Sequence, residues 1–406
     1  MEASGGRIKS FPAGLENGGG MSLWVFALCS FAASASGRAI DPLITLIAGD
    51  FAVSVPTAAL LSSAYALPFA LFQPLLGPIG DIWGKSRLLR TALWLLALTL
   101  LAGAFAPTLG LLLLLRFLGG IGGGGTIPSG MALLGDRYAG PQRQVAIGRF
   151  VGAGLAGQIV GGSMAGLLAE TLGWRGTLLL AGGVVLIAAI AASATLREAP
   201  DRAERRFSLS AAIDGYRLVF ANPRAYLCFA AVLGEGIALW GVTPYVADIM
   251  MRSGTGGTRE AGFAVGAIGV GGLAFTVALP WMLRALGRAV MMATGGVLGA
   301  TGLLALAAAL PGWGVGAAFA VSGFGYMMLH NAIQNESVEL APSARSSSYS
   351  MHAFFFFTGQ SLGPIIVGLL LSHAGRAMAM SACAALFVTT GIVVAVLFAR
   401  LDRART

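Results

Sequence analysis

Charged side chains are scarce in this sequence: they make up 11% of its 406 residues, whereas apolar side chains make up 56%. Water-soluble domains carry about 25% charged residues, so most of the surface of this protein does not face water. Cysteine is rare too. Cys29, Cys228 and Cys383 all fall in apolar stretches, which argues against a disulfide framework. The sequence has no P-loop lysine motif, metal-ligand cluster or nucleophile elbow, so we expect no metal, no cofactor and no ATP-driven activity.

Long apolar segments dominate what remains. A hydrocarbon core about 30 Å thick is crossed by roughly 20 helical residues. Segments of suitable length are 22–49, 57–78, 88–106, 108–134, 147–170, 176–196, 224–250, 260–283, 289–310, 312–335, 346–372 and 376–399. The sequence therefore predicts an all-α membrane protein with twelve transmembrane helices, six in each half.

Basic residues are concentrated on one side of these segments. If both termini share a side, 20 of the 26 lysines and arginines fall on that side and four on the other. Because cytoplasmic loops carry an excess of Lys and Arg, we expect both termini in the cytoplasm and the chain in a bacterial inner membrane. The net charge of +9 then faces anionic membrane lipids and requires no nucleic acid.

The chain repeats itself at half its length. Residues 157–173 recur as 359–375, an offset of 202 residues (359 minus 157), with Gln158 recurring as Gln360. Two equal apolar halves around a central path are typical of secondary transporters. The expected organisation is a disordered cytoplasmic N-terminus (1–20), a six-helix bundle (21–196), a cytoplasmic linker (197–223), a second pseudo-symmetric six-helix bundle (224–399) and a cytoplasmic tail (400–406).

The clearest ionisable side chains inside the apolar segments are Arg38 and Asp41 on the first, Arg116 on the fourth, Glu235 on the seventh and His330 on the tenth. A charge at the bilayer centre costs at least ~2.5–3.5 kcal/mol, so each is a functional candidate. They lie on every third helix, as expected if each half contains two three-helix repeats whose first helices line one cavity. Glu235 lies about 14 Å into its helix, with no cation in the preceding turn. We expect these five residues to couple transport to protons, with Glu235 foremost.

Each of these side chains also has a structural interpretation. Arg38 could neutralise Asp41, Arg116 could pair with Asp41 or hold helices together, and His330 could hydrogen-bond across helices. Candidates for contacts with a small-molecule substrate are polar and aromatic residues facing the path: Tyr65, Gln73, Gln158, Trp240, Tyr245, Asn331, Gln334 and Gln360. Trp240 and Tyr245 could instead anchor the end of their helix at the membrane interface.

The segment after the second apolar stretch resembles a family signature. Residues 77–87 read Gly-Pro-Ile-Gly-Asp-Ile-Trp-Gly-Lys-Ser-Arg, similar to the pattern GxxxD(R/K)xG(R/K)(R/K) of the major facilitator superfamily. The matching residues are Gly77, Asp81, Gly84 and Lys85, with Arg87 one position beyond the pattern; Ile82 and Ser86 stand where basic residues are usual. The resemblance implies a gating loop in which Asp81 caps a helix terminus of the other half.

Two further segments extend this resemblance. Residues 116–122 look like the signature RxxQGxG with Gly119 in the Gln position, and the family associates this arginine, here Arg116, with proton transfer. Residues 157–162 are similar to the antiporter signature GPxxGG, with Gln158 in the Pro position. The segment 38–51 looks like the opening of the drug and sugar efflux branch, near arabinose-efflux-like and Bcr/CflA-like permeases.

These observations predict a proton-coupled permease that works as a monomer by alternating access and exports a small organic compound or drug. An importer or uniporter of a small organic solute or anion on the same fold stays open; without proton coupling it would lose little on Glu235→Gln. A membrane-embedded enzyme, such as an acyl or glycosyl transferase, is the other alternative. Its nearest acid/base constellation is the stretch 331–339 with His352, which lacks a nucleophile.

Overall fold

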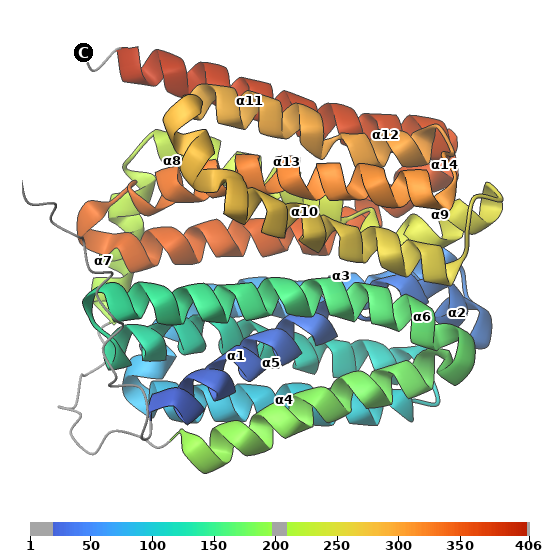
Figure 1. Cartoon of the computed structure of the whole chain (residues 1–406), viewed down its shortest axis with the longest axis horizontal. Helices are drawn as coiled ribbons and strands as arrows, with labels where there is room; N and C mark the ends of the chain where they lie inside the picture. Colours follow the sequence, from blue (N-terminus) through green and yellow to red (C-terminus); the bar gives the residue numbers. More distant parts are fainter. Residues whose placement is uncertain (1–18, 197–208, 404–406) are drawn as a thin grey trace, which may run out of the picture.

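The computed structural model describes residues 19–196 and 209–403, and within these ranges it is built of helices packed side by side (Figure 1). Ten helical stretches in the described ranges are long and apolar enough to cross a membrane. Two of them, 140–195 and 342–401, are about twice the usual length and are interrupted at Gly173 and Gly375. Each interruption divides its stretch into two crossings, so the described part of the chain contains the twelve expected spans.

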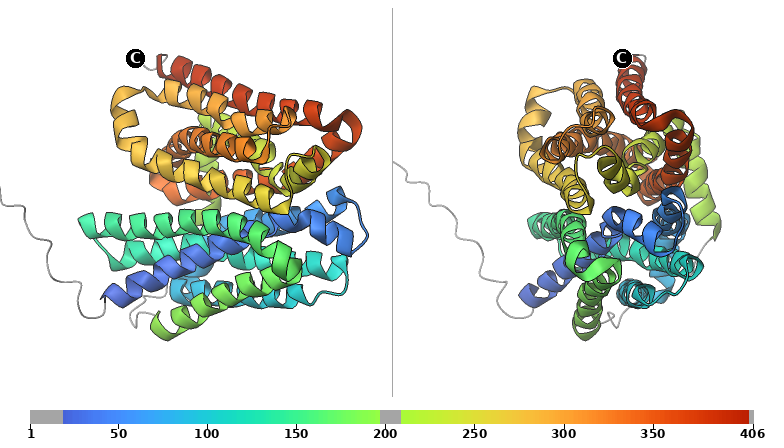
Figure 2. Two further views of the ribbon diagram at one scale, coloured as in Figure 1. Left: turned by 45° about the vertical axis from the view of Figure 1, so that its right-hand side comes forward. Right: turned by 90° about the vertical axis from the view of Figure 1, so that its right-hand side faces the viewer.

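The spans form two bundles, one from each half of the chain (Figure 2). The first bundle contains α1 (Gly19–Arg38), η1 (Asp41–Leu43), α2 (Ile44–Asp50), α3 (Val55–Trp83), α4 (Lys85–Ala104), α5 (Leu109–Arg137) and α6 (Gly140–Thr195). The second contains α8 (Arg224–Glu235), the π-helix η2 (Gly236–Trp240), η3 (Thr243–Tyr245), α9 (Val246–Arg252), α10 (Thr258–Ala285), α11 (Arg288–Gly299), α12 (Thr301–Ala307), α13 (Gly312–Val338), η4 (Pro342–Ala344) and α14 (Arg345–Arg403).

The two ends of the bundles differ, and we name them here. The linker face is the end at which α7 (Leu209–Phe220) and the last turns of α14 lie, on the left of Figure 1. The far face is the opposite end, where α2, α9 and the interruptions of α6 and α14 lie. Helix α7 falls within the expected linker 197–223, of which residues 197–208 lie outside the described ranges. The Tyr216 hydroxyl donates a hydrogen bond to the Pro74 carbonyl (2.8 Å), which ties α7 to α3.

The repeated glycines have the same tasks in both halves. Gly173 (φ 65°) and Gly375 (φ 73°) form the sharp turns of α6 and α14, in a backbone region that glycine adopts without steric cost. A Cβ atom on Gly161 would lie 2.2 Å from the Ala35 carbonyl oxygen of α1, and one on Gly363 would lie 2.6 Å from the Gly241 Cα. Small residues let helix backbones approach this closely. In each half, the repeated glycines therefore form both a sharp turn and a close contact between helices.

Three local details differ from the expectation, although both apolar segments concerned are candidate membrane spans, Leu23–Asp50 and Arg224–Arg252. The helix expected over 22–49 ends at Arg38 and resumes at Ile44, and the helix expected over 224–250 changes to π and 3-10 geometry between residues 236 and 245. Both interruptions contain a proline, Pro42 or Pro244, which has no backbone N–H to continue the helix. The expected gating loop is largely helical, because α3 continues to Trp83 and α4 begins at Lys85. Of the expected N-terminal segment 1–20, residues 1–18 lie outside the described ranges, while 19–20 begin α1.

Candidate functional site

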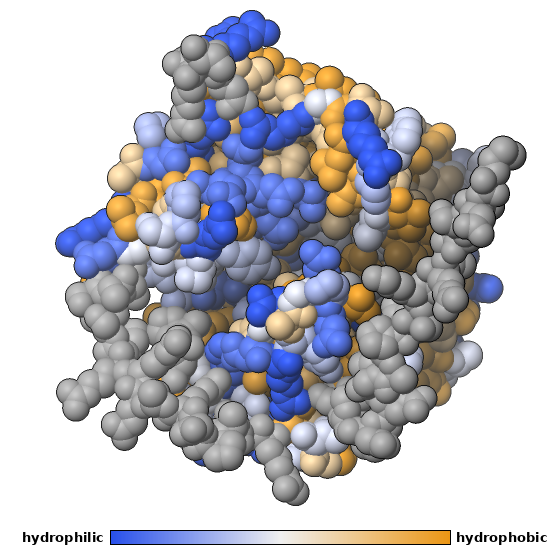
Figure 3. All heavy atoms as spheres, turned by 60° about the vertical axis from the view of Figure 1, so that its left-hand side comes forward, coloured by the Kyte–Doolittle hydropathy of each residue, from blue (hydrophilic) through white to orange (hydrophobic). Residues whose placement is uncertain are grey.

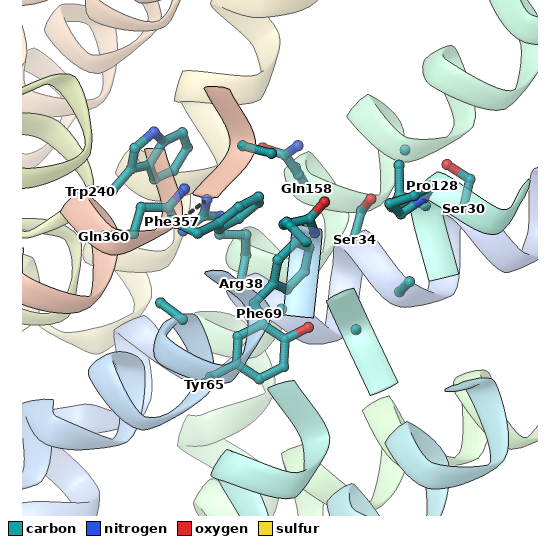
Figure 4. Close-up of a pocket in the computed structure, with 18 of the residues that line it drawn as sticks. Ser30, Ser34, Arg38, Tyr65, Phe69, Pro128, Gln158, Trp240, Phe357 and Gln360 are labelled. Atoms are coloured by element: carbon teal, nitrogen blue, oxygen red, sulfur yellow. Dashed lines mark hydrogen bonds between the residues drawn. The ribbon is translucent and has the colours of Figure 1, made fainter. Parts of the chain in front are cut away.

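A cavity of about 290 Å³ lies between the two bundles (Figure 4). Helices α1, α3, α5 and α6 line it from the first bundle, and η2, η3 and α14 line it from the second. Eight of the thirteen predicted coupling and substrate residues contribute to its wall: Arg38, Asp41, Tyr65, Gln73, Arg116, Gln158, Trp240 and Gln360. The sequence therefore places most of its unusual intramembrane polar groups around one space.

This cavity extends toward the linker face. Ser30, Phe150 and Tyr349 line it on that side. Hydrophilic side chains gather on the linker face around a hollow between the two bundles (Figure 3). Toward the far face the bundles touch: Ser361 donates a hydrogen bond to the Ser63 carbonyl (3.2 Å), and η1 packs against η3. The conformation is closed at the far face.

Asp41 is the centre of this closure. Its carboxylate is 3% exposed and accepts hydrogen bonds from the Ser62 hydroxyl (2.7 Å) and, across the two bundles, from the Thr243 hydroxyl (2.9 Å). The Arg38 guanidinium lies 3.9 Å from the same carboxylate. Both carboxylate oxygens are therefore occupied by protein donors, with one donor from each half of the chain.

Arg38 joins the bundles in two further ways. Its guanidinium lies 3.6 Å from the centre of the Trp240 ring and donates a hydrogen bond to the Gln360 side-chain oxygen (3.2 Å). Arg38 and Trp240 are 202 positions apart (240 minus 38), as are Asp41 and Thr243 (243 minus 41). Each pair thus occupies equivalent positions of the internal repeat. Two contacts of the far-face closure therefore join repeat-equivalent residues that meet where the two halves face each other.

Arg116 is buried, at 4% exposure, and its guanidinium lies 4.3 Å from the centre of the Tyr65 ring. Its Nε has no hydrogen-bond partner among the described residues. Of the two pairings considered for Asp41, the described ion pairs show the one with Arg38 and do not include Arg116. Asp41 is already held by the Ser62 and Thr243 hydroxyls, which leaves Arg116 facing the cavity without a carboxylate.

Glu235 lies behind the cavity wall, inside the second bundle. It is fully buried, and its Oε2 lies 2.9 Å from the His330 Nδ1, while its Oε1 has no hydrogen-bond partner in the described part of the chain. The Tyr326 ring lies between this pair and the cavity, with its centre 5.1 Å from that of His330 and 5.5 Å from that of Trp240. One aromatic side chain thus separates the buried acid from a cavity-lining residue.

The polar chain continues from His330 toward the linker face. The ring centres of His330 and His352 are 5.1 Å apart, and the His352 Nδ1 is hydrogen-bonded to the Ser337 hydroxyl (3.0 Å). Within the described residues, no group of three or more His, Cys, Asp or Glu side chains is placed to hold a metal ion.

The remaining predicted residues lie elsewhere. Tyr245 is 1% exposed and donates a hydrogen bond to the Pro364 carbonyl (2.6 Å) within the second bundle. The Asn331 side-chain oxygen accepts a hydrogen bond from Asn335 (3.2 Å), and Gln334 is half-buried on α13. These three, like Glu235 and His330, are not among the cavity-lining residues.

In the expected gating segment, the Lys85 ammonium pairs with Asp136 at the end of α5 (2.8 Å), within the same bundle. Gly84, at φ 99°, separates α3 from α4, and Arg87 is exposed. The surroundings of Gly77 and the side chain of Asp81 lie outside the described part, so the latch contact expected of Asp81 stays a prediction.

Sequence reasoning missed Ser62 and Thr243 as partners of Asp41, and the aromatic pair Phe69 and Phe357. The ring centres of this pair are 3.8 Å apart across the two bundles. For Thr243 the sequence did contain a signal, because it occupies the position of Asp41 in the second repeat. The other contacts depend on how helices distant in the sequence are oriented.

Two pseudo-symmetric helical bundles around a central cavity define a secondary transporter. A sequence profile of the Major Facilitator Superfamily matches residues 26–364, and the chain belongs to this superfamily. It is therefore a multi-pass integral membrane transporter and not an enzyme, and the predicted family and fold class are confirmed.

Individual relatives agree with this assignment. The uncharacterised MFS-type transporter YybF of Bacillus subtilis is 29% identical over 174 residues, which cover 41% of this chain and 43% of that protein. The multi-drug resistance efflux pump PmrA of Streptococcus pneumoniae is 30% identical over 141 residues, 35% of each chain. The probable efflux pump mfs2 of Aspergillus flavus is 29% identical over 135 residues, 33% of this chain and 32% of that one. The matched segments span less than half of each relative.

The arrangement of the helices is also similar to a solved structure. A crystal structure of a variant of the nucleoside transporter NupG superimposes with a TM-score of 0.75, covering 94% of this chain and 99% of that chain at 15% identity. At this identity the likeness concerns the fold.

Proposed function

We propose that this transporter exports a small organic compound in exchange for protons, with Glu235 as the coupling residue. The observation that carries the proposal is the Glu235–His330 pair: a fully buried carboxyl group in the middle of an interrupted helix, one aromatic ring away from the cavity. An ionised carboxylate in such surroundings is costly unless it is paired. A group of this kind changes the stability of its bundle when it gains or loses a proton.

In this proposal the linker face is cytoplasmic. The support is the bias of basic residues, with 20 of the 26 lysines and arginines in segments on that side. The cavity then loads substrate from the cytoplasm while the Asp41–Thr243 contact keeps the far face closed. Protonation of Glu235 from the outside removes the charge of a buried carboxylate behind the cavity wall. The halves 21–196 and 224–399 then rock, and the open side changes from one face to the other.

The relatives support export as the direction. Efflux pumps from a bacterium and from a fungus match segments of this chain at about 30% identity. We propose a single chain as the transporting unit, because both halves of one chain line the cavity. The membrane that we propose for it is a bacterial inner membrane. Its partners are the substrate, protons and membrane lipids.

Transport into inverted membrane vesicles tests this proposal. Vesicles with an acidic lumen and the native chain are expected to take up members of a panel of small organic anions, cations and neutral compounds. Glu235→Gln should remove the dependence on the proton gradient. Glu170→Gln, which changes an exposed carboxylate on α6, should leave it unchanged.

Two results would contradict the proposal in different ways. A transport rate that changes neither with the proton gradient nor on Glu235→Gln would indicate a uniporter, with Glu235 in a structural role. Gradient-driven loss of substrate from preloaded inverted vesicles would indicate an importer instead. The unchanged control variant separates either result from a general loss of folded protein.

A further inference from the structure

The charge of the cavity wall is unbalanced. Two arginines, Arg38 and Arg116, line the cavity, and Asp41 is the acidic residue among the lining residues of the described chain. Asp41 accepts hydrogen bonds on both oxygens and has Arg38 as its nearest cation. Arginine stays protonated in proteins, and no ion pair among the described residues includes Arg116. Its positive charge therefore faces the cavity with Asp41, which already pairs with Arg38, as the acidic residue of the same wall.

Three buried hydrogen-bond donors on cavity-lining residues have no partner among the described residues: the Trp240 Nε1, the Arg116 Nε and the Gln360 Nε2. The Arg116 Nε and the Gln360 Nε2 are both solvent-inaccessible, and neither meets an acceptor within the described residues. The Gln360 oxygen is already used by Arg38, so the free atom of this amide is its donor. Buried N–H groups without acceptors are energetically costly. A bound molecule can supply an acceptor to the Arg116 Nε and the Gln360 Nε2.

Aromatic rings fix how this acceptor can be approached. The Arg116 guanidinium lies over the Tyr65 ring, 4.3 Å from its centre. The Arg38 guanidinium lies over the Trp240 ring, 3.6 Å from its centre. A guanidinium whose face is covered by a ring keeps its N–H edge for a planar, bidentate acceptor such as a carboxylate. The Phe69–Phe357 contact adds an apolar wall to the same cavity (Figure 4).

The volume limits the size of the ligand. Pockets for drug-sized molecules usually enclose about 300–1,000 Å³, and this cavity, at about 290 Å³, lies at the lower limit of that range. One ring, or two fused rings, with a small polar group fits such a volume between aromatic walls.

We propose that the cavity binds a small planar aromatic carboxylate, with Arg116 holding the carboxylate and the Gln360 amide donating to an acceptor of the ligand. This inference deepens the proposed function and rests on it for the direction of transport. The binding itself requires no proton gradient, so the two can fail separately. The same features disfavour organic cations, because Arg116 would repel them and the cavity carboxylate is already occupied.

A series of three compounds with one ring system tests the proposal. Purified full-length protein is titrated by calorimetry with 1-naphthoate, 1-naphthylmethanol and 1-naphthylmethylammonium. We expect naphthoate to bind about 10-fold or more tightly than the alcohol, the factor typical of a charge-assisted hydrogen bond, and the ammonium compound to bind most weakly. Arg116→Gln should reduce the affinity for naphthoate about 10- to 100-fold and leave that for the alcohol nearly unchanged.

Two variants serve as references. Arg116→Lys keeps the charge and should retain part of the preference for the anion. Arg259→Gln removes a positive charge from the exposed start of α10 and should bind all three compounds as the native chain does. A thermal melt of each variant confirms that it is folded before its affinities are compared.

Measurements on the native chain alone can overturn the proposal. They do so if the three compounds bind with equal affinity, if the ammonium compound binds more tightly than naphthoate, or if none of them binds. A folded Arg116→Gln variant that keeps the full preference for naphthoate also overturns it. Naphthoate that binds selectively but is not transported under a proton gradient contradicts the coupling mechanism and leaves the ligand class standing.

Discussion

Replacing Thr243 by valine removes one hydroxyl from the far-face closure and keeps the shape of the side chain. The Thr243 Oγ1 donates across the bundles to Asp41 and lies equally close, at 2.9 Å, to the Trp240 carbonyl of its own helix. A hydrogen bond to a charged group contributes about 1.5–3 kcal/mol. Because one hydroxyl proton is shared between two acceptors, we expect the lower value, which corresponds to a shift of about 10-fold toward the far-face-open state.

Electron-spin distance measurements can detect this shift. Spin labels are attached at Phe105→Cys and Leu310→Cys, two exposed positions at the far face on different bundles. The native Cys29, Cys228 and Cys383 are buried, which protects them from labelling. The population of longer distances should rise about 10-fold in Thr243→Val.

The control is Thr276→Val on α10, an exposed threonine whose hydroxyl bonds to the Gly272 carbonyl of its own helix. It should leave the distance distribution unchanged. If Thr243→Val also leaves it unchanged, the Asp41–Thr243 contact does not hold the far face closed, and the reasoning is refuted.

Two further predictions concern folding and can be checked by thermal unfolding in detergent. Gly161→Ala should lower the free energy of unfolding by about 1–3 kcal/mol, because the added Cβ would lie 2.2 Å from the Ala35 carbonyl oxygen. The control Gly148→Ala, which has open space around the added Cβ, should be neutral or slightly stabilising. Equal melting temperatures of the two variants would contradict the close packing of α1 and α6. Burial raises the pKa of the Tyr216 hydroxyl above its ordinary value of 10.0, so its stabilising contact with Pro74 is fully present below pH 10 and is lost as the pH rises through the folded-state pKa. Tyr216→Phe should therefore lose less stability than the native chain as the pH rises above 10.0, and parallel pH profiles would argue against this.

Composition and repetition predicted the fold well, for a physical reason. Membrane crossing demands about 20 apolar residues per helix, a constraint that each segment must satisfy alone, so spans can be counted without knowledge of their neighbours. The turn glycines Gly173 and Gly375 were likewise visible as a repeat. The interruptions near Arg38 and Glu235 were missed, although Pro42 and Pro244, at equivalent positions, are their local signal.

The site could be predicted only in part. The residue types that line the cavity were found because polar groups in a membrane are rare and expensive. Their pairing was not, because the Glu235–His330 contact depends on the relative rotation of α8 and α13, which no local pattern fixes. The sequence left the choice between Arg38 and Arg116 as the partner of Asp41 open. The two hydroxyl groups that occupy the carboxylate oxygens, Ser62 and Thr243, were not predicted.

The meeting of equivalent residues at the far face has a consequence for the energetics of the transport cycle. Residues that face their own repeat counterparts lie close to the pseudo-two-fold axis that relates the two halves. This axis runs from the far face to the linker face, so the rotation about it exchanges the two halves but not the two faces. The symmetry of the chain therefore does not reproduce the Asp41–Thr243 and Arg38–Trp240 contacts at the other end. Closure at the linker face must use other side chains. Substitutions at one face can thus adjust the free energy of one closed state independently of the other, and so set the resting orientation of the transporter.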